Sequence, residues 1–286
     1  MTTRKTMKKK KNNSNNIYKI YYWLTGIIIF ISLIFFFRTT IIMYYYIIKE
    51  KFDKKEYVFN NLEKKRKKSE ELKIQMTINR YRSYAFGIDI SQHQGNINWD
   101  SLNLIKKDLP ISFAFVRATR GIFYQDAFFN KNWKNLKQKN IIRGAYHYYD
   151  VNKSSTDQAN NFINTVTLEK GDLPPVLDIE ELPRKQSLTQ LKKGILNWLE
   201  IVESKYKIKP IIYSNDAYFI HHIPDLDLSD YHIWVANYNP RDNPKHQQWS
   251  FWQFSEQGII KGITQNFVDL NVFKGDINDL KKITLH

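Results

Sequence analysis

Runs of apolar and β-branched residues recur at wide and rather regular intervals through the C-terminal two thirds of the chain. Seven of these runs have the length and composition of buried strands: 85–91, 111–119, 141–149, 174–180, 209–214, 231–238 and 249–255. Stretches with helical character lie between several of them, at 130–139, 155–168 and 188–205. Strands separated by helices pair in parallel, and seven or eight such units in about 200 residues indicate a closed barrel.

The predicted fold is therefore an α/β domain over residues 83–286, an irregular TIM-like β/α barrel whose helical layer is incomplete near its last, closely spaced strands. Active sites of such barrels lie at the carboxyl ends of the strands. The polar and aromatic residues at these ends are Asp89, Arg117, His147, Tyr148, Asp178, Glu180, Tyr213, Asn237, Tyr238, Trp252 and Gln253. Acids at the mouth of an apolar barrel are costly to bury, and flat rings around them suit a sugar-binding groove.

The N-terminal third has a different pattern. From Ile20 to Phe37 no residue is charged, and these 18 residues span about 27 Å as a helix, close to the thickness of a bilayer core. Aromatic residues suited to a membrane interface stand at its start: Tyr18, Tyr21, Tyr22 and Trp23. We expect a single transmembrane signal anchor at 17–38.

Two alternatives to an anchor remain, a cleaved signal peptide and a buried helix of a soluble protein. A signal peptide has a shorter apolar region that ends at a small-residue cleavage site. The sequence after Phe37, RTTIIMYYYIIKEK, contains no such site. The length and flanks favour the anchor.

Charge is concentrated in the same N-terminal part. Of 44 Lys and Arg and 28 Asp and Glu, residues 1–82 hold 20 and 6, so +14 of the net charge of +16 lies there and +2 lies in the barrel domain. A nucleic-acid-binding domain carries its basic residues on the folded part, so we expect no nucleic-acid partner. The basic tail at 1–16 favours a cytoplasmic N-terminus.

Residues 39–82 form the predicted spacer. From Lys49 onward it is rich in charge and has neither Gly nor Pro, which is typical of a solvated helix that can also touch anionic lipid or cell-wall polymer. A short coiled coil is the alternative, although the heptads are not sustained. The basic run from Lys64 to Lys68 has no assigned partner.

The chain has no cysteine, which excludes disulfide scaffolds, zinc–cysteine sites and thiol catalysis. It also has no HExxH, P-loop or dinucleotide-binding GxGxxG motif. We expect neither a cofactor nor a metal.

The sequence LDIE at 177–180 carries the clearest chemistry. In a strand Asp178 and Glu180 point to the same side, roughly 6.6 Å apart along the chain. Two carboxyls so close perturb each other, and one can stay protonated near neutral pH. Glycosidic cleavage needs such a proton donor and a neighbouring anion. The alternative is a plain solvated D-x-E at a strand end.

The order of motifs resembles glycoside hydrolase family 25, the Chalaropsis-type lysozymes. The resemblance covers 84–275 and rests on FGIDISQHQGNINWD (86–100), FAFVRATRGIFYQDAFFNKNW (113–133), RGAYHYY (143–149), QANNFI (158–163), LPPVLDIE (173–180), PIIYS (210–214), YHIWVANY (231–238) and FWQFSEQGIIKGITQNFVDLNVF (251–273). It implies an irregular β/α barrel that hydrolyses the β-1,4 bond between N-acetylmuramic acid and N-acetylglucosamine in peptidoglycan.

The resemblance also implies roles for single residues. The general acid falls on Glu180, and its companion Asp178 stabilises the transition state or orients the acetamido group of the substrate. The acids Asp89 and Asp269 shape the charge of the site and position sugar or water. The residues expected to bind substrate are Tyr148, Tyr213, Trp252, Arg117 and Asn237.

One position departs from the family pattern. Many relatives have R-A-T-E-G after the second strand, whereas this chain has Arg120 in place of the glutamate, which can alter subsite preference. A retaining or an inverting outcome is not determined by the sequence. The alternative to an active enzyme is a catalytically silent peptidoglycan-binding or scaffold protein of the same fold.

Peptidoglycan lies outside the cytoplasmic membrane, so the predicted partner also fixes the predicted location. We expect a single-pass protein of that membrane with residues 1–16 in the cytoplasm and the catalytic domain on the periplasmic or extracellular side.

Overall fold

The computed structural model describes residues 3–102, 104–106, 108–239, 243–246 and 248–286. The chain divides into two compact units, Met1–Lys68 and Ser69–His286. The first unit is helical and comprises α1 (Thr3–Phe36) and the greater part of α2 (Arg38–Arg80). The first two residues of the predicted tail at 1–16 lie outside the described residues.

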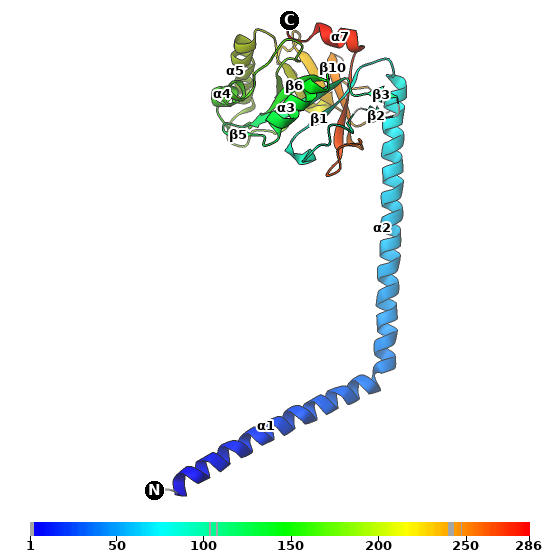
Figure 1. The fold of residues 1–286 in the computed structure, drawn as a ribbon, viewed down its shortest axis with the longest axis vertical. Helices are drawn as coiled ribbons and strands as arrows, with labels where there is room; N and C mark the ends of the chain where they lie inside the picture. The colour runs from blue at the N-terminus through cyan, green and yellow to red at the C-terminus, as the bar shows by residue number, and fades with distance from the viewer. Residues whose placement is uncertain (1–2, 103, 107, 240–242, 247) are drawn as a thin grey trace. The chain divides into compact units, whose positions relative to one another are not determined.

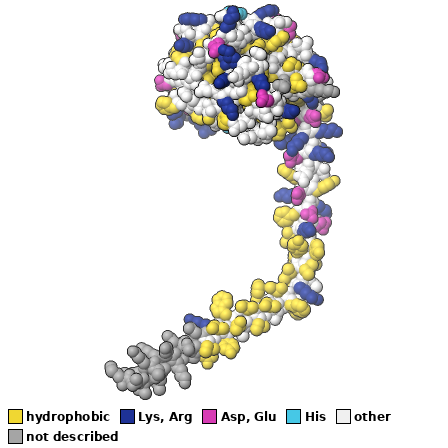
Figure 2. Space-filling view, in the orientation of Figure 1, with side chains coloured by type: hydrophobic (Ala, Val, Ile, Leu, Met, Phe, Trp, Pro, Cys, Tyr) yellow, Lys and Arg dark blue, Asp and Glu magenta, His cyan; other side chains and the backbone are white. Residues whose placement is uncertain are grey.

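One helical stretch among the described residues, Ile17–Phe36, is long and apolar enough to cross a membrane, with a mean hydropathy of 1.9 and none of it buried. Figure 2 shows apolar side chains along this helix and along the first part of α2. Charged residues follow in α2, where ion pairs such as Lys54–Glu50 (2.9 Å) and Lys67–Glu63 (2.7 Å) join successive turns. Helix α2 covers residues 38–80 and so runs through most of the segment at 39–82.

The second unit is a closed barrel (Figure 1). Its eight strands follow the ring order β1 (Phe86–Ile90), β11 (Val268–Phe273), β10 (Trp249–Gly258), β9 (His232–Ala236), β8 (Ile211–Asn215), β7 (Val176–Asp178), β6 (Ile142–Tyr148) and β4 (Phe113–Arg120), and β4 pairs with β1 to close it. Each of the seven predicted strand runs overlaps one of these strands, and β4, β8 and β10 extend past the ends of their runs. The run that forms β11 was not among them.

The ring departs from a regular β/α barrel at β11. This strand is antiparallel to both neighbours, β10 and β1, whereas the other pairs are parallel. A short connection joins β10 to β11, so the chain returns as a hairpin and needs no crossover helix. The expectation of an incomplete helical layer near the last strands is confirmed.

Helices cover the outside of the remaining ring. The predicted helices are α3 (Phe129–Gln138), α4 (Ser155–Thr165) and α5 (Leu188–Tyr206), and Figure 1 shows α4 beside α5. The smaller elements are η1 (Gln92–Gln94), β2 (Leu104–Lys106), β3 (Leu109–Pro110), β5 (Tyr124–Gln125), α6 (Asp216–His221) and α7 (Ile277–Lys282).

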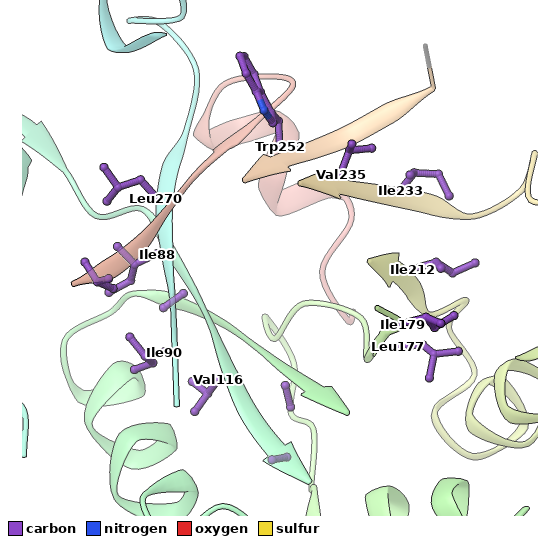
Figure 3. Close-up of a cluster of buried hydrophobic side chains, with 14 of the residues drawn as sticks. Ile88, Ile90, Val116, Leu177, Ile179, Ile212, Ile233, Val235, Trp252 and Leu270 are labelled. Carbon is purple, nitrogen blue, oxygen red and sulfur yellow. The ribbon is translucent and has the colours of Figure 1, made fainter. Parts of the chain in front are cut away.

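Alternation along each strand separates two hydrophobic layers. The outer layer lies between barrel and helices and includes Ile88, Val116, Leu177, Ile212 and Val235 (Figure 3). The inner layer fills the ring, where Phe115 of β4 stacks on Trp234 of β9 at 4.4 Å between ring centroids and meets Phe251 of β10 at 5.2 Å. These strands lie across the ring from β4, so aromatic rings close the barrel interior.

The last turns of α2 belong to the barrel unit. Thr77 and Ile78 are buried, and Lys106 pairs with Glu71 at 3.6 Å. The compact unit thus begins at Ser69, whereas the sequence placed the start of the barrel domain at residue 83.

Candidate active site

A cleft of about 520 Å³ opens at the carboxyl ends of the barrel strands. It is lined by Asp89, Ser91, His93, Gln94, Arg117, Tyr146, Tyr148, Asp178, Glu180, Tyr213, Trp234, Tyr238, Gln253, Glu256, Gln257, Phe267 and Asp269. Its strand residues occupy the same alternate positions as the inner aromatic layer: Asp89 follows Gly87, and Arg117 follows Phe115. The inward-facing residues, at every second position of a strand, are therefore largely aromatic inside the barrel and polar at its mouth.

Seven of the nine residues predicted for the site are brought together in this cleft: Asp89, Arg117, Tyr148, Asp178, Glu180, Tyr213 and Asp269. All four predicted acids are among them. Trp252 and Asn237 do not line the cleft.

The side chain of Trp252 points away from the cleft, so the prediction that it binds substrate is corrected. The side chain is fully buried in the outer layer (Figure 3), where Val235 and Val272 are its cross-strand partners, because Phe251 and Gln253 on either side of it point inward. Its indole Nε1 donates to the carbonyl of Asn237 at 2.7 Å.

Asn237 is corrected as well. Its side chain donates to Asp216 Oδ2 at 2.6 Å and accepts from the amide of Asn239 at 2.8 Å. It therefore orders the chain that follows β9 and does not face the cleft.

Asp89 and Asp269 form one pair of acids. They are directly opposed in the antiparallel ladder of β1 and β11, and their carboxyls hydrogen bond to each other. Asp89 Oδ2 also accepts from Gln253 Nε2 at 2.9 Å and from Asn271 Nδ2 at 2.8 Å. Burial and the negative charge of Asp89 raise the pKa of Asp269 to about 9. Because the side-chain amides of Gln253 and Asn271 donate to it, Asp89 carries the negative charge of the pair. Asp269 carries the proton.

Asp178 and Glu180 form the second pair. Asp178 is buried at the end of β7, whereas Glu180 follows the strand and is exposed in the cleft. Their carboxyls hydrogen bond to each other. Burial and the nearby charge of Glu180 raise the pKa of Asp178 well above its usual range, and loss of water around the carboxyl also raises the pKa of Glu180. Such a pair retains one proton near neutral pH.

Several cleft residues were missed by the sequence reasoning or were left without a role: Tyr146, Trp234, Tyr238, Gln253 and Glu256. Gln253 is the most connected of them. Its Nε2 donates to Asp89, and its Oε1 accepts from the hydroxyls of Tyr213 and Tyr238, both at 2.8 Å. Alternation along the strands could have identified two of these residues. Gln253 shares its strand face with Phe251, and Trp234 shares its face with Ala236, and both faces point into the barrel.

Two cations stand beside the acids. Arg117 is buried, and its Nε lies 3.0 Å from Oδ2 of Asp126, which is itself fixed by the amides of Gln92 and Phe128. Arg120 lies over the ring of Tyr148, 4.6 Å from its centroid. Its charge lowers the pKa of Glu180, opposing the effect of burial.

The arrangement can supply a proton and hold a neighbouring negative charge in an open groove with aromatic walls. Within the described part of the chain, no three His, Asp or Glu side chains are grouped as metal ligands. The chemistry that this donor set supports is general acid catalysis on a polar, ring-shaped substrate.

Comparison with known proteins agrees with this geometry. The family model for glycosyl hydrolases family 25 matches residues 88–263, which include Asp89, Asp178 and Glu180 but end before Asp269. YegX of Escherichia coli is 37% identical over 198 residues, which are 68% of this chain and 71% of that protein. Lysozyme M1 of Streptomyces globisporus is 33% identical over 207 residues, covering 66% of this chain and 67% of the lysozyme.

A solved structure shares the fold. The bacterial lysozyme from Streptomyces coelicolor superimposes with a TM-score of 0.63 at 31% identity, over 71% of this chain and 97% of that one.

Proposed function

The chain belongs to glycosyl hydrolases family 25 and is a muramidase acting on peptidoglycan, and we propose that Glu180 is the general acid that cleaves its β-1,4 glycosidic bond. The observation that carries this assignment is the contact between Glu180 and Asp178. It keeps one proton on the pair, and Glu180 is the member that is exposed in the cleft.

The proton moves toward Glu180 when substrate binds. In the free enzyme burial favours the protonated form of Asp178. A sugar in the cleft removes water from Glu180 and raises its pKa further, so the shared proton transfers to the carboxyl that meets the leaving oxygen. Asp178 then carries the negative charge next to the reacting carbon.

We propose that Asp178 orients a group of the substrate and does not activate a water molecule. It stands beside Glu180 at the same strand end and interacts directly with it, so the two carboxyls do not flank a water on the opposite face of the sugar. Its anion orients the acetamido group of N-acetylmuramic acid, whose oxygen attacks the anomeric carbon as Glu180 protonates the departing oxygen. Water then opens the cyclic intermediate, and the Glu180 carboxylate takes its proton.

The remaining cleft residues bind and position the glycan. Tyr148 and Tyr238 are accessible at the mouth and offer ring faces for pyranose stacking. Asp89 and Asp269 keep one negative charge on the wall opposite the site of proton transfer, and Arg117 adds a fixed cation. Tyr213 supports this wall through Gln253.

We also propose that residues 17–38 anchor the enzyme in the cytoplasmic membrane. Support comes from the apolar, fully exposed helix at Ile17–Phe36 and from the basic tail before it. In this arrangement residues 1–16 are cytoplasmic, 39–82 form the helical spacer and 83–286 act on the wall outside. Reporter fusions at residue 2 and at residue 286 test this topology, and activity of both reporters on one side contradicts it.

The enzymatic assignment is tested with the purified full chain in detergent and isolated peptidoglycan. We expect new reducing ends with the wild type and a loss of more than a thousandfold with Glu180→Gln. Glu200→Gln, an exposed acid on α5, serves as the matched control and retains full activity. If wild type and Glu180→Gln bind the polymer equally and neither releases muropeptides, the chain is a silent glycan-binding protein. Release of free amines instead of reducing ends also overturns the assignment.

A further inference from the structure

A second cavity of about 380 Å³ adjoins the catalytic cleft, and the mechanism does not use it. It lies over the carboxyl ends of β4 and β6, and its wall includes Arg120, Phe123, Asp150 and Lys153. It shares two wall residues, His93 and Arg117, with the cleft. A molecule seated in the cleft can therefore extend into this cavity.

The two cavities differ in charge. The cleft is walled by acids, whereas the side cavity has Arg117, Arg120 and Lys153 against the single acid Asp150. Arg117 is paired with Asp126 at 3.0 Å, and Arg120 faces Glu181 at 3.8 Å with both side chains half exposed. Lys153 is exposed and has no ion-pair partner among the residues that the structure describes. Cationic donors thus remain available at this surface.

Apolar surface is present next to these charges. Phe123 is 85% exposed, which leaves nearly its whole ring in water. Gly121, with φ of 54°, makes the turn that presents it. A ligand that combines carboxylates with small apolar side chains matches both features.

We propose that this side cavity binds the acidic stem peptide of peptidoglycan, an inference that rests on the proposed function. The stem branches from the muramic acid beside the scissile bond, so it must leave the cleft close to Glu180. Its carboxylates are repelled by the acidic cleft and attracted by Arg120 and Lys153. Asp150 can accept an amine of the peptide, and Phe123 covers its alanine side chains.

The test compares two substrates with the full chain in detergent. One is glycan freed of attached anionic polymer but bearing its stems, and the other is the same glycan stripped of stems by an amidase. We expect Lys153→Glu to lower kcat/KM about tenfold on the first substrate, mainly through KM, and less than twofold on the second. Lys153→Arg should retain the wild-type ratio.

The control is Lys170→Glu, an exposed lysine before β7 at the amino end of the strand, which should change neither rate. Equal effects of Lys153→Glu on both substrates, or no effect on either, overturn the proposal. A third substrate is glycan that still carries its anionic polymer, and an effect of Lys153→Glu on this substrate alone assigns the cavity to polymer phosphates and also overturns the proposal. If the wild type cleaves neither substrate, the proposed function itself has failed.

Discussion

Asp89 and Asp269 stand directly opposite each other where β1 and β11 pair, and their carboxyls share a hydrogen bond. Like charges opposed on neighbouring strands are destabilising, so the pair persists only with a proton bound. This cost is concentrated at the functional cleft, as is common for enzymes. It gives the fold a measurable dependence on pH.

We expect Asp269→Asn to stabilise the protein and to impair catalysis. The pKa of Asp269 is raised to about 9, so the folded protein keeps a proton that the unfolded chain releases above about pH 4. The wild type therefore loses stability as pH rises from about 4 to 9, and the asparagine does not. Thermal unfolding should show a Tm gain of a few degrees at pH 8 that shrinks toward pH 5. A gain independent of pH contradicts the assignment of the proton.

The neighbours Trp252 and Gln253 should differ in their effects because they face opposite layers. Gln253→Leu removes a donor from Asp89 and an acceptor from Tyr213 and Tyr238, so we expect kcat to fall at least tenfold. Trp252→Phe should lower the Tm while KM stays within about twofold, because its ring packs in the outer layer and against Tyr81 and its Nε1 donates to the Asn237 carbonyl, all away from the cleft. Steady-state kinetics and thermal melts of both variants test these expectations. A raised KM for Trp252→Phe would show that Trp252 contributes to substrate binding.

The sequence predicted the parts of the barrel that follow from local pattern. The motifs LDIE and GIDIS place three acids at strand ends, and their strand positions make them face one cleft. Trp252 was misassigned because its aromatic character outweighed the alternation that Phe251 and Gln253 define. The pairing of Asp89 with Asp269 was not predictable from period alone, since it depends on β11 entering the ring antiparallel. That reversal follows from the short connection between β10 and β11, which returns the chain as a hairpin without a crossover helix.

Arg120 should set the upper pH limit of activity. Its charge lowers the pKa of Glu180, and the general acid must be protonated to act. Arg120→Gln removes that charge, so the pKa of Glu180 rises and the alkaline limb of the kcat/KM profile should move upward by a few tenths of a unit at low salt. Lys153→Gln is the matched control and should leave the limb in place. A downward movement with Arg120→Gln contradicts the electrostatic role.

His147 should make the fold sensitive to acid. It is buried in the outer layer, stacked on Trp198 at 5.7 Å between ring centroids, with its ring nitrogens 2.7 Å from Thr119 Oγ1 and 3.2 Å from Gln158 Oε1. Burial lowers its pKa to about 4, so the unfolded chain binds a proton below about pH 6.5 that the folded protein refuses.

Stability is therefore lost as pH falls from about 6.5 to 4, by up to about 3 kcal/mol from this group. His147→Gln should be less stable at pH 7 by about 1–3 kcal/mol, and its deficit should narrow by pH 4.5. Urea unfolding at the two pH values measures this difference. A deficit of equal size at both would show that His147 does not titrate in this range.

The contact between Asp178 and Glu180 predicts the stereochemistry of the product. Inverting glycosidases separate their carboxyls by about 6.5–9.5 Å to hold a water, and retaining enzymes with a protein nucleophile by about 5–5.5 Å. Asp178 and Glu180 lie side by side at the end of β7 and interact directly, so they do not face each other across a sugar ring. The nucleophile on the opposite face is then the acetamido oxygen of the substrate, and two successive displacements retain the β configuration. Proton NMR of a soluble glycan oligomer in the first minutes, before mutarotation, should show the β anomer first. Initial appearance of the α anomer would instead assign the attack to a water held by Asp89 across the cleft.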